Sequence, residues 1–215
     1  MLVSWKRKME VSMSLFDKFK NSSKKAIAGK NVALPDKVNK ARETALEFLP
    51  ILKGKLVLPD GSLHTGTMLS AAAWLTGTSL YRAFKINTKE PPGTIIKSEA
   101  FNKEWESLMF LLEQYNFEKA DIPAGRLMLA AIAAPDSLKP KIDMPTIQSE
   151  LQGIFNAMMQ KHGFDYLEST RVGIILCTIL IQQYKEAEIL DTHVAAGIVA
   201  QGVLEAAKTV PPPLN

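Results

Sequence analysis

Hydrophobic residues recur three or four positions apart through most of the 215-residue chain, with polar residues between them. This spacing places the hydrophobic side chains on one face of an α-helix. The pattern predicts eight helices, over residues 14–28, 35–53, 62–85, 98–116, 122–134, 146–163, 165–186 and 192–208. No segment shows convincing alternation of the strand type, so we expect an all-α fold, a single bundle of about seven to eight helices.

Several residues indicate where these helices begin and end. Pro35 suits a first helical turn, and Pro50 is expected to kink or end the same helix. Asp165 and Glu168 have the spacing of a capping box, which predicts a helix start at this point. Asp191 is expected to cap the last helix.

The most hydrophobic stretch is VGIILCTILI, residues 172–181. Ten residues of helix span roughly 15 Å, about half the hydrocarbon thickness of a bilayer, so we do not expect a transmembrane segment. A helix that is apolar all round must be covered on every side. We therefore predict that residues 168–186 form the central helix of the bundle. Five of its side chains are expected to be mostly buried: Ile174, Ile175, Leu176, Ile179 and Leu180.

Charge is unevenly distributed along the chain. Residues 1–30 hold eight basic and two acidic residues, a net charge of +6, whereas the remaining 185 residues hold 18 basic and 20 acidic residues, a net charge of −2. We therefore predict a basic N-terminal arm over 1–30, with a short amphipathic helix, and an α-helical globular domain over 31–215. The segment MSLFDKFK, residues 13–20, has the pattern of a natural chain start, so residues 1–12 are interpreted as an upstream extension.

The basic arm has two interpretations. It is either a solvated chain end or a segment that makes weak contact with an anionic surface. A near-neutral body argues against specific nucleic-acid binding. A single cysteine, Cys177, allows no internal disulfide, and the N-terminus lacks the apolar block of a secretory signal. The expected compartment is the cytoplasm.

Motifs that would indicate catalysis are missing from the sequence. The three histidines, His64, His162 and His193, are far apart, and none belongs to an HExxH or Glu-x-x-His motif. With one cysteine, a structural zinc site is not expected. Phosphate-binding, dinucleotide-binding and hydrolase motifs rich in glycine are also missing. We therefore expect no cofactor and no metal, and we name no catalytic residue.

A stripe of small and aromatic residues on the helix at 62–85 is the main candidate site. Its members recur at alternating steps of four and three: Thr67, Ser70, Trp74, Gly77 and Tyr81. His64 and Arg82 lie on a neighbouring face of the same helix. One interpretation is a ligand groove formed by His64, Thr67, Ser70, Trp74, Tyr81 and Arg82. The other is close helix packing, since small residues let a second helix approach.

These observations favour a non-enzymatic α-helical protein that acts through protein interaction or self-association. A second hypothesis is a helical protein that binds a small, largely apolar ligand near Trp74 and Tyr81. A third is an enzyme with a dispersed acid/base pair, such as His64 with a carboxylate. A closed core would favour the first hypothesis, and a cavity of several hundred cubic ångströms with convergent polar groups would favour the others.

Overall fold

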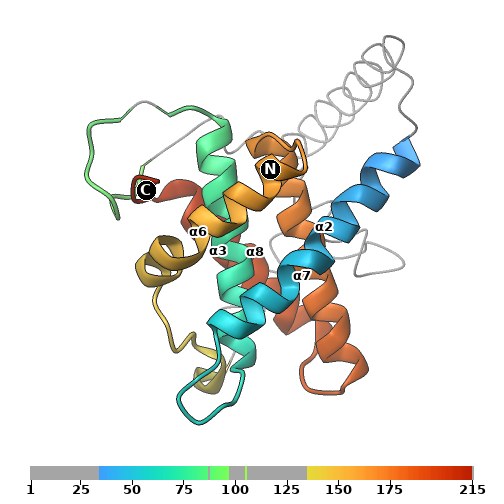
Figure 1. The fold of residues 1–215 in the computed structure, drawn as a ribbon. Helices are drawn as coiled ribbons and strands as arrows, with labels where there is room; N and C mark the ends of the chain where they lie inside the picture. The colour runs from blue at the N-terminus through green and yellow to red at the C-terminus, as the bar shows by residue number, and fades with distance from the viewer. Residues whose placement is uncertain (1–33, 87, 97–104, 106–134, 215) are drawn as a thin grey trace, which may run out of the picture. The chain divides into compact units, whose positions relative to one another are not determined.

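The structure is a computed structural model that describes residues 34–86, 88–96, 105 and 135–214. Its α-helices are α2 (Leu34–Lys55), α3 (Thr65–Ala83), α6 (Met144–Lys161), α7 (Tyr166–Glu186) and α8 (Thr192–Lys208), and its 3-10 helix is η1 (Asp136–Leu138) (Figure 1). These residues contain five α-helices and no strand beyond two isolated bridges, which confirms an all-α fold for them. The predicted count of seven to eight is not supported, because the helices expected over 14–28, 98–116 and 122–134 lie outside the described residues except for Trp105.

Contacts divide the chain into two units between Asn39 and Lys40, inside α2. The second unit contains the rest of α2 and the helices α3, α6, α7 and α8. Within the described part of the chain, no helix is long and apolar enough to cross a membrane. The predicted division into an arm over 1–30 and a domain over 31–215 stays a prediction.

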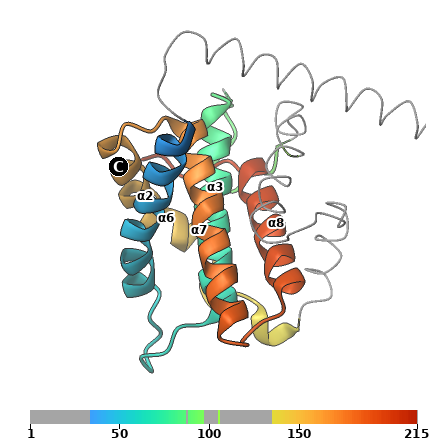
Figure 2. The same cartoon turned by 90° about the vertical axis from the view of Figure 1, so that its right-hand side faces the viewer.

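Helix α3 occupies the position that we predicted for residues 168–186. Every residue from Gly66 to Tyr81 is buried, and α3 contacts α6, α7, α8 and η1 (Figure 2). In α7, Ile174, Leu176 and Leu180 are buried as predicted, whereas Ile175 and Ile179 are only half-buried. The prediction of a central α7 is therefore wrong. The small side chains of α3 explain the difference, because they let neighbouring helices approach α3 closely on several sides.

Three glycines mark close approaches of α3 to α7 and α8. A Cβ added at Gly77 of α3 would lie 2.8 Å from the Ala206 Cβ and 2.9 Å from the Ala207 N of α8. At Gly202 of α8 it would lie 2.7 Å from the Ala73 Cβ, and at Gly173 of α7 it would overlap the Thr76 hydroxyl. Side chains larger than hydrogen at these positions would separate α3 from α7 and α8.

The predicted helix ends agree with the structure at the C-terminal helices. Asp165 accepts a hydrogen bond from the Glu168 N–H at 2.8 Å, and the Glu168 carboxylate accepts one from the Asp165 N–H, which completes the capping box. The Asp191 carboxylate accepts hydrogen bonds from the N–H groups of His193 and Val194 at the start of α8. These helix starts are fixed by residues two to three positions apart, so the local sequence suffices to predict them.

Pro50 does not end α2, which continues to Lys55. Proline removes the hydrogen bond to the carbonyl of Leu46. Both Pro50 and Leu46 are exposed, so water can solvate that carbonyl. On its buried side, α2 packs the Phe48 ring against Phe155 of α6, with centroids 5.0 Å apart and ring planes at 76°. This edge-to-face contact holds α2 on the core despite the lost hydrogen bond.

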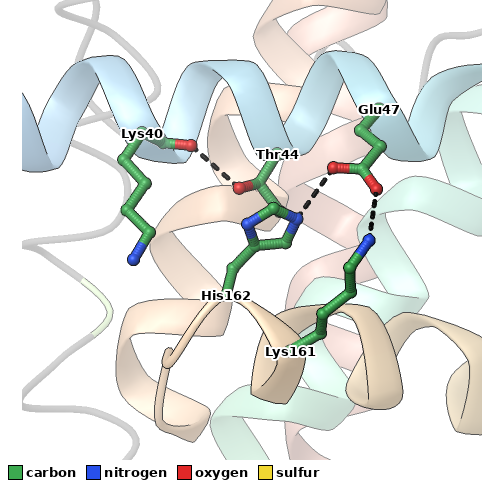
Figure 3. A network of polar contacts seen from close by, with 5 residues as sticks. All are labelled: Lys40, Thr44, Glu47, Lys161 and His162. Carbon is green, nitrogen blue, oxygen red and sulfur yellow. Dashed lines mark hydrogen bonds and ion pairs between the residues drawn. The ribbon is translucent and has the colours of Figure 1, made fainter.

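A polar cluster also joins α2 to the end of α6 (Figure 3). The Glu47 carboxylate accepts from Lys161 Nζ at 3.2 Å and pairs with His162 Nε2 at 2.7 Å. The Glu47 pKa is lowered below its ordinary value. The hydrogen bond from Lys161 is the largest cause, and the hydrogen bond from His162 is the next. The cluster is partly exposed to solvent, so each pair contributes modestly to stability.

Candidate functional site

The six predicted site residues fall into three separate groups along α3. His64 and Thr67 fasten the loop that contains η1 to the start of the helix. Ser70 and Trp74 line a cleft between α3, α8 and the same loop. Tyr81 and Arg82 lie at the other end of α3 and do not line the cleft. The structure therefore does not unite the six residues in one groove.

His64 is the N-cap residue of α3. Its Nδ1 accepts a hydrogen bond from the Thr67 N–H at 3.2 Å and lies 2.9 Å from the Thr67 hydroxyl oxygen, while its Nε2 lies 2.6 Å from the Ser137 carbonyl oxygen. These partners fit the neutral tautomer that carries its proton on Nε2. The Thr67 hydroxyl also accepts from the Lys141 N–H at 2.8 Å. With both ring nitrogens engaged, His64 has the role of a structural residue, which weakens the hypothesis that it acts as a catalytic acid or base.

The cleft has a volume of about 440 Å³. Its α3 wall is formed by Ser70 and Trp74. The α8 wall and the loop supply the other lining residues: Ile198, Gln201, Gly202 and Glu205 from α8, and Pro135, Asp136, Leu138, Lys139 and Pro140 from the loop. Apolar and polar groups thus share its surface.

The loop wall is held firmly against α3. A Cβ at Gly66 would overlap the carbonyl oxygen of Leu138, so the loop backbone rests directly on the first turn of the helix. The hydrogen bonds of His64 with Ser137 and of Thr67 with Lys141 fix the loop on either side of this contact. The cleft is therefore a preformed feature of the fold, since its loop wall has three points of attachment to α3.

Ser70 is only 5% exposed, and its side chain lines the cleft. Several hydroxyl groups within these helices donate to the carbonyl four residues earlier, as Thr76 and Ser79 do in α3. The Ser70 hydroxyl makes no such bond in the described structure, and it is not among the buried side-chain atoms that lack a partner there, so it is open to solvent in the cleft. A hydroxyl in this position can bind water or a ligand.

Glu205 stands on the α8 wall of the cleft. One carboxylate oxygen accepts a hydrogen bond from the Gln201 side-chain amide at 2.8 Å, and the other accepts one from the Trp74 indole N–H at 3.4 Å. A carboxylate has about four acceptor positions, so two of them stay available to a ligand. Trp74 is 5% exposed, and Glu205 therefore also satisfies the polar atom of a nearly buried indole.

Tyr81 and Arg82 form a second polar group, at the C-terminal end of α3. Burial raises the pKa of the Tyr81 hydroxyl and lowers the pKa of the Arg82 guanidinium. Arg82 donates through Nη2 to the Pro212 carbonyl at 2.7 Å, which ties the C-terminal segment to the helix. The Tyr81 hydroxyl and Arg82 Nε are buried without a partner in the described structure. They do not line the cleft described above, so they are not assigned to the candidate site.

The other histidines lie outside the cleft. His162 pairs with Glu47, and His193 lies 3.5 Å from the Asp191 carboxylate, which is already used as a helix cap. The described residues contain no group of three or more side chains suited to hold a metal ion. Sequence reasoning did not identify Gln201, Glu205 or the loop at 135–140 as parts of a site. Glu205 meets Trp74 across 131 positions of sequence, and no local pattern signals such a pair.

Comparison with known proteins provides no relative. No family model matches the chain, and neither the curated proteins nor the solved structures contain a significant match. Function must therefore be argued from the cleft and its chemistry.

Proposed function

We propose that this α-helical protein acts by binding, without catalysis, and that the cleft between α3, α8 and the 135–140 loop holds a small ligand. The cleft itself, with Ser70 in its α3 wall, is the observation that carries this proposal. Ser70 is joined there by the Glu205 carboxylate and the edge of Trp74. A cleft volume of about 440 Å³, with polar groups in the lining, supports this proposal over a closed core.

The rest of α3 supports a division of roles within one helix. The face that carries Gly77 packs against the backbone of α8 and leaves no room for a ligand. Ser70 and Trp74 lie one to two turns earlier and border the cleft. The stripe predicted from the sequence thus combines helix packing at one end with a candidate site at the other.

A second candidate function is protein interaction or self-association in the cytoplasm, as the sequence favoured. The side chain of Ile95 is 77% exposed, the highest value among the large hydrophobic residues described. The backbone of Ile95 forms an isolated antiparallel bridge with that of Thr209. An exposed isoleucine on a backbone segment held in place can contribute to a protein interface, although single exposed hydrophobic residues are common on protein surfaces.

Native mass spectrometry of the purified full chain distinguishes the two functions. The cleft proposal predicts a small-molecule adduct that is lost when Ser70→Leu fills the cleft. Ser149→Leu, at an exposed position of α6, is the matched control and should retain the adduct. Multimers without an adduct, in both the parent and the Ser70→Leu variant, would favour the second function and contradict the first.

A further inference from the structure

We infer that the cleft recognises an organic cation, a primary amine on an apolar stem, with its ammonium group between Glu205 and Ser70. This inference rests on the proposed binding function and specifies the ligand class. Among the described residues that line the cleft, three are charged: Asp136, Lys139 and Glu205. Their pairing decides which sign of ligand charge the cleft favours.

Lys139 cannot readily attract an anion, because its ammonium group lies 2.8 Å from the Asp136 carboxylate. Each of these two charges compensates the other. Among the residues that the structure describes, the exposed Glu205 carboxylate receives only neutral donors, the Gln201 amide and the Trp74 indole N–H. Its negative charge is therefore the unbalanced charge of the lining, and a cationic ligand is the complementary partner.

The hydrogen-bonding groups favour the same class. An ammonium group has three donors and no acceptor. The free acceptor positions of the Glu205 carboxylate and the lone pairs of the Ser70 hydroxyl can receive them. Next to these groups the lining is apolar, with Leu138 and Ile198 among its members, so that an alkyl stem can be removed from water. A neutral alcohol could not form a charge-assisted hydrogen bond with Glu205, and a carboxylate would be repelled by the negative charge of Glu205.

The test uses three six-carbon probes that differ only in their end group: hexylammonium, hexanol and hexanoate. Each is titrated into the ¹⁵N-labelled full chain while the indole N–H signal of Trp74, assigned from Trp74→Phe, is followed by NMR. We expect a saturable shift with hexylammonium, and affinities at least about tenfold lower for the other two probes, since a charge-assisted bond is worth roughly that factor. Raising the salt concentration should weaken the binding of hexylammonium.

Two variants locate the interaction. Glu205→Gln keeps an acceptor for the Trp74 N–H but removes the charge, so it should lower hexylammonium affinity about tenfold and abolish the preference over hexanol. Glu150→Gln makes the same charge change on the exposed face of α6. It should change neither the hexylammonium affinity nor the preference over hexanol. Ser70→Ala should weaken hexylammonium binding without lowering stability, because the hydroxyl is open to solvent in the cleft.

The outcomes separate the two proposals. If hexanol or hexanoate binds as tightly as hexylammonium, or if Glu205→Gln and Glu150→Gln behave alike, the cation inference is wrong while the binding function stands. If hexylammonium causes no saturable shift but the native protein carries an adduct that Ser70→Leu removes, the ligand belongs to another class and the cation inference is again wrong. If neither probe nor adduct occupies the cleft, both proposals fail.

Discussion

The contact between α3 and α8 at Gly77 offers a direct test of how the core is built. Replacing Gly77 by alanine adds a Cβ that overlaps the Val203 carbonyl oxygen and lies 2.8 Å from the Ala206 Cβ. The Ala207 N would lie 2.9 Å away. Two of these three atoms belong to the backbone of another helix, so they cannot be relieved by a change of side-chain rotamer. Helix α8 has to move away from α3 to accommodate the methyl group.

Two effects of opposite sign determine the free energy of unfolding of Gly77→Ala. Alanine in place of glycine within a helix stabilises by about 1 kcal/mol. Overpacking of a well-packed core costs about 1–3 kcal/mol. Gly153→Ala in α6 is the matched control, because no atom lies within 4 Å of its added Cβ and only the first effect applies. The two alanine variants should therefore differ by about 1–3 kcal/mol, the overpacking cost alone.

Equilibrium unfolding in urea, followed by circular dichroism, measures both variants against the parent. We expect Gly153→Ala to raise the midpoint concentration of urea. Gly77→Ala should leave it unchanged or lower it, with a slope similar to that of the parent. A Gly77→Ala protein that gains as much stability as Gly153→Ala would show that α3 and α8 are not in backbone contact at this position. The close packing inferred for α3 would then be wrong.

Further predictions concern the core and the cluster at Glu47. Burial raises the pKa of the Cys177 thiol to about 12, so a thiol reagent should label it only when the protein unfolds, and rapid labelling of the folded protein would contradict its placement. Leu176→Ala should lower the free energy of unfolding by about 2–5 kcal/mol, and Ile175→Ala, at a half-buried position, by less. The Glu47 pKa is lowered in the folded state, so its contribution to stability is present above the ordinary pKa of a glutamate and is lost as the pH falls. The stability difference between the parent and Glu47→Gln should therefore shrink as the pH falls from about 5 to about 3, and a difference that stays constant would contradict this assignment.

Features that depend on neighbouring residues were accessible from the sequence. Asp165 with Glu168, and Asp191 with the first N–H groups of α8, are caps whose partners lie within three positions. Hydrophobic spacing likewise identified α3, α6, α7 and α8, because the buried hydrophobic residues of each helix recur three or four positions apart. Such features are set by local geometry, which the order of residues specifies directly.

The position of each helix in the bundle was harder to predict. The run of apolar residues in α7 suggested a central helix, yet α3 is buried along nearly its whole length. Hydrophobicity favours burial but does not measure how closely helices can approach. Gly77, together with the alanines that precede it, allows contacts on several sides of α3, whereas Ile175 and Ile179 of α7 reach the edge of the core.

The candidate site was predicted only in part. Ser70 and Trp74 were identified as site residues because they share a face of one helix. Glu205 and the 135–140 loop were missed, since they meet that face across large separations in sequence. Arg82 was included because of helical spacing, but its partner is the Pro212 carbonyl. Periodicity therefore defines one wall of the cleft, and tertiary packing supplies the others.

Fluorine NMR of protein labelled with 5-fluorotryptophan would show whether the cleft binds small molecules. The chain has three tryptophans, Trp5, Trp74 and Trp105, so each spectrum contains its own controls. Screening of a small-molecule library should yield compounds that shift the Trp74 signal saturably and leave the other two unchanged. Ser70→Leu should abolish the shift while the protein stays folded. If no compound moves the Trp74 signal, or if the shift persists in Ser70→Leu, the cleft is not a binding site.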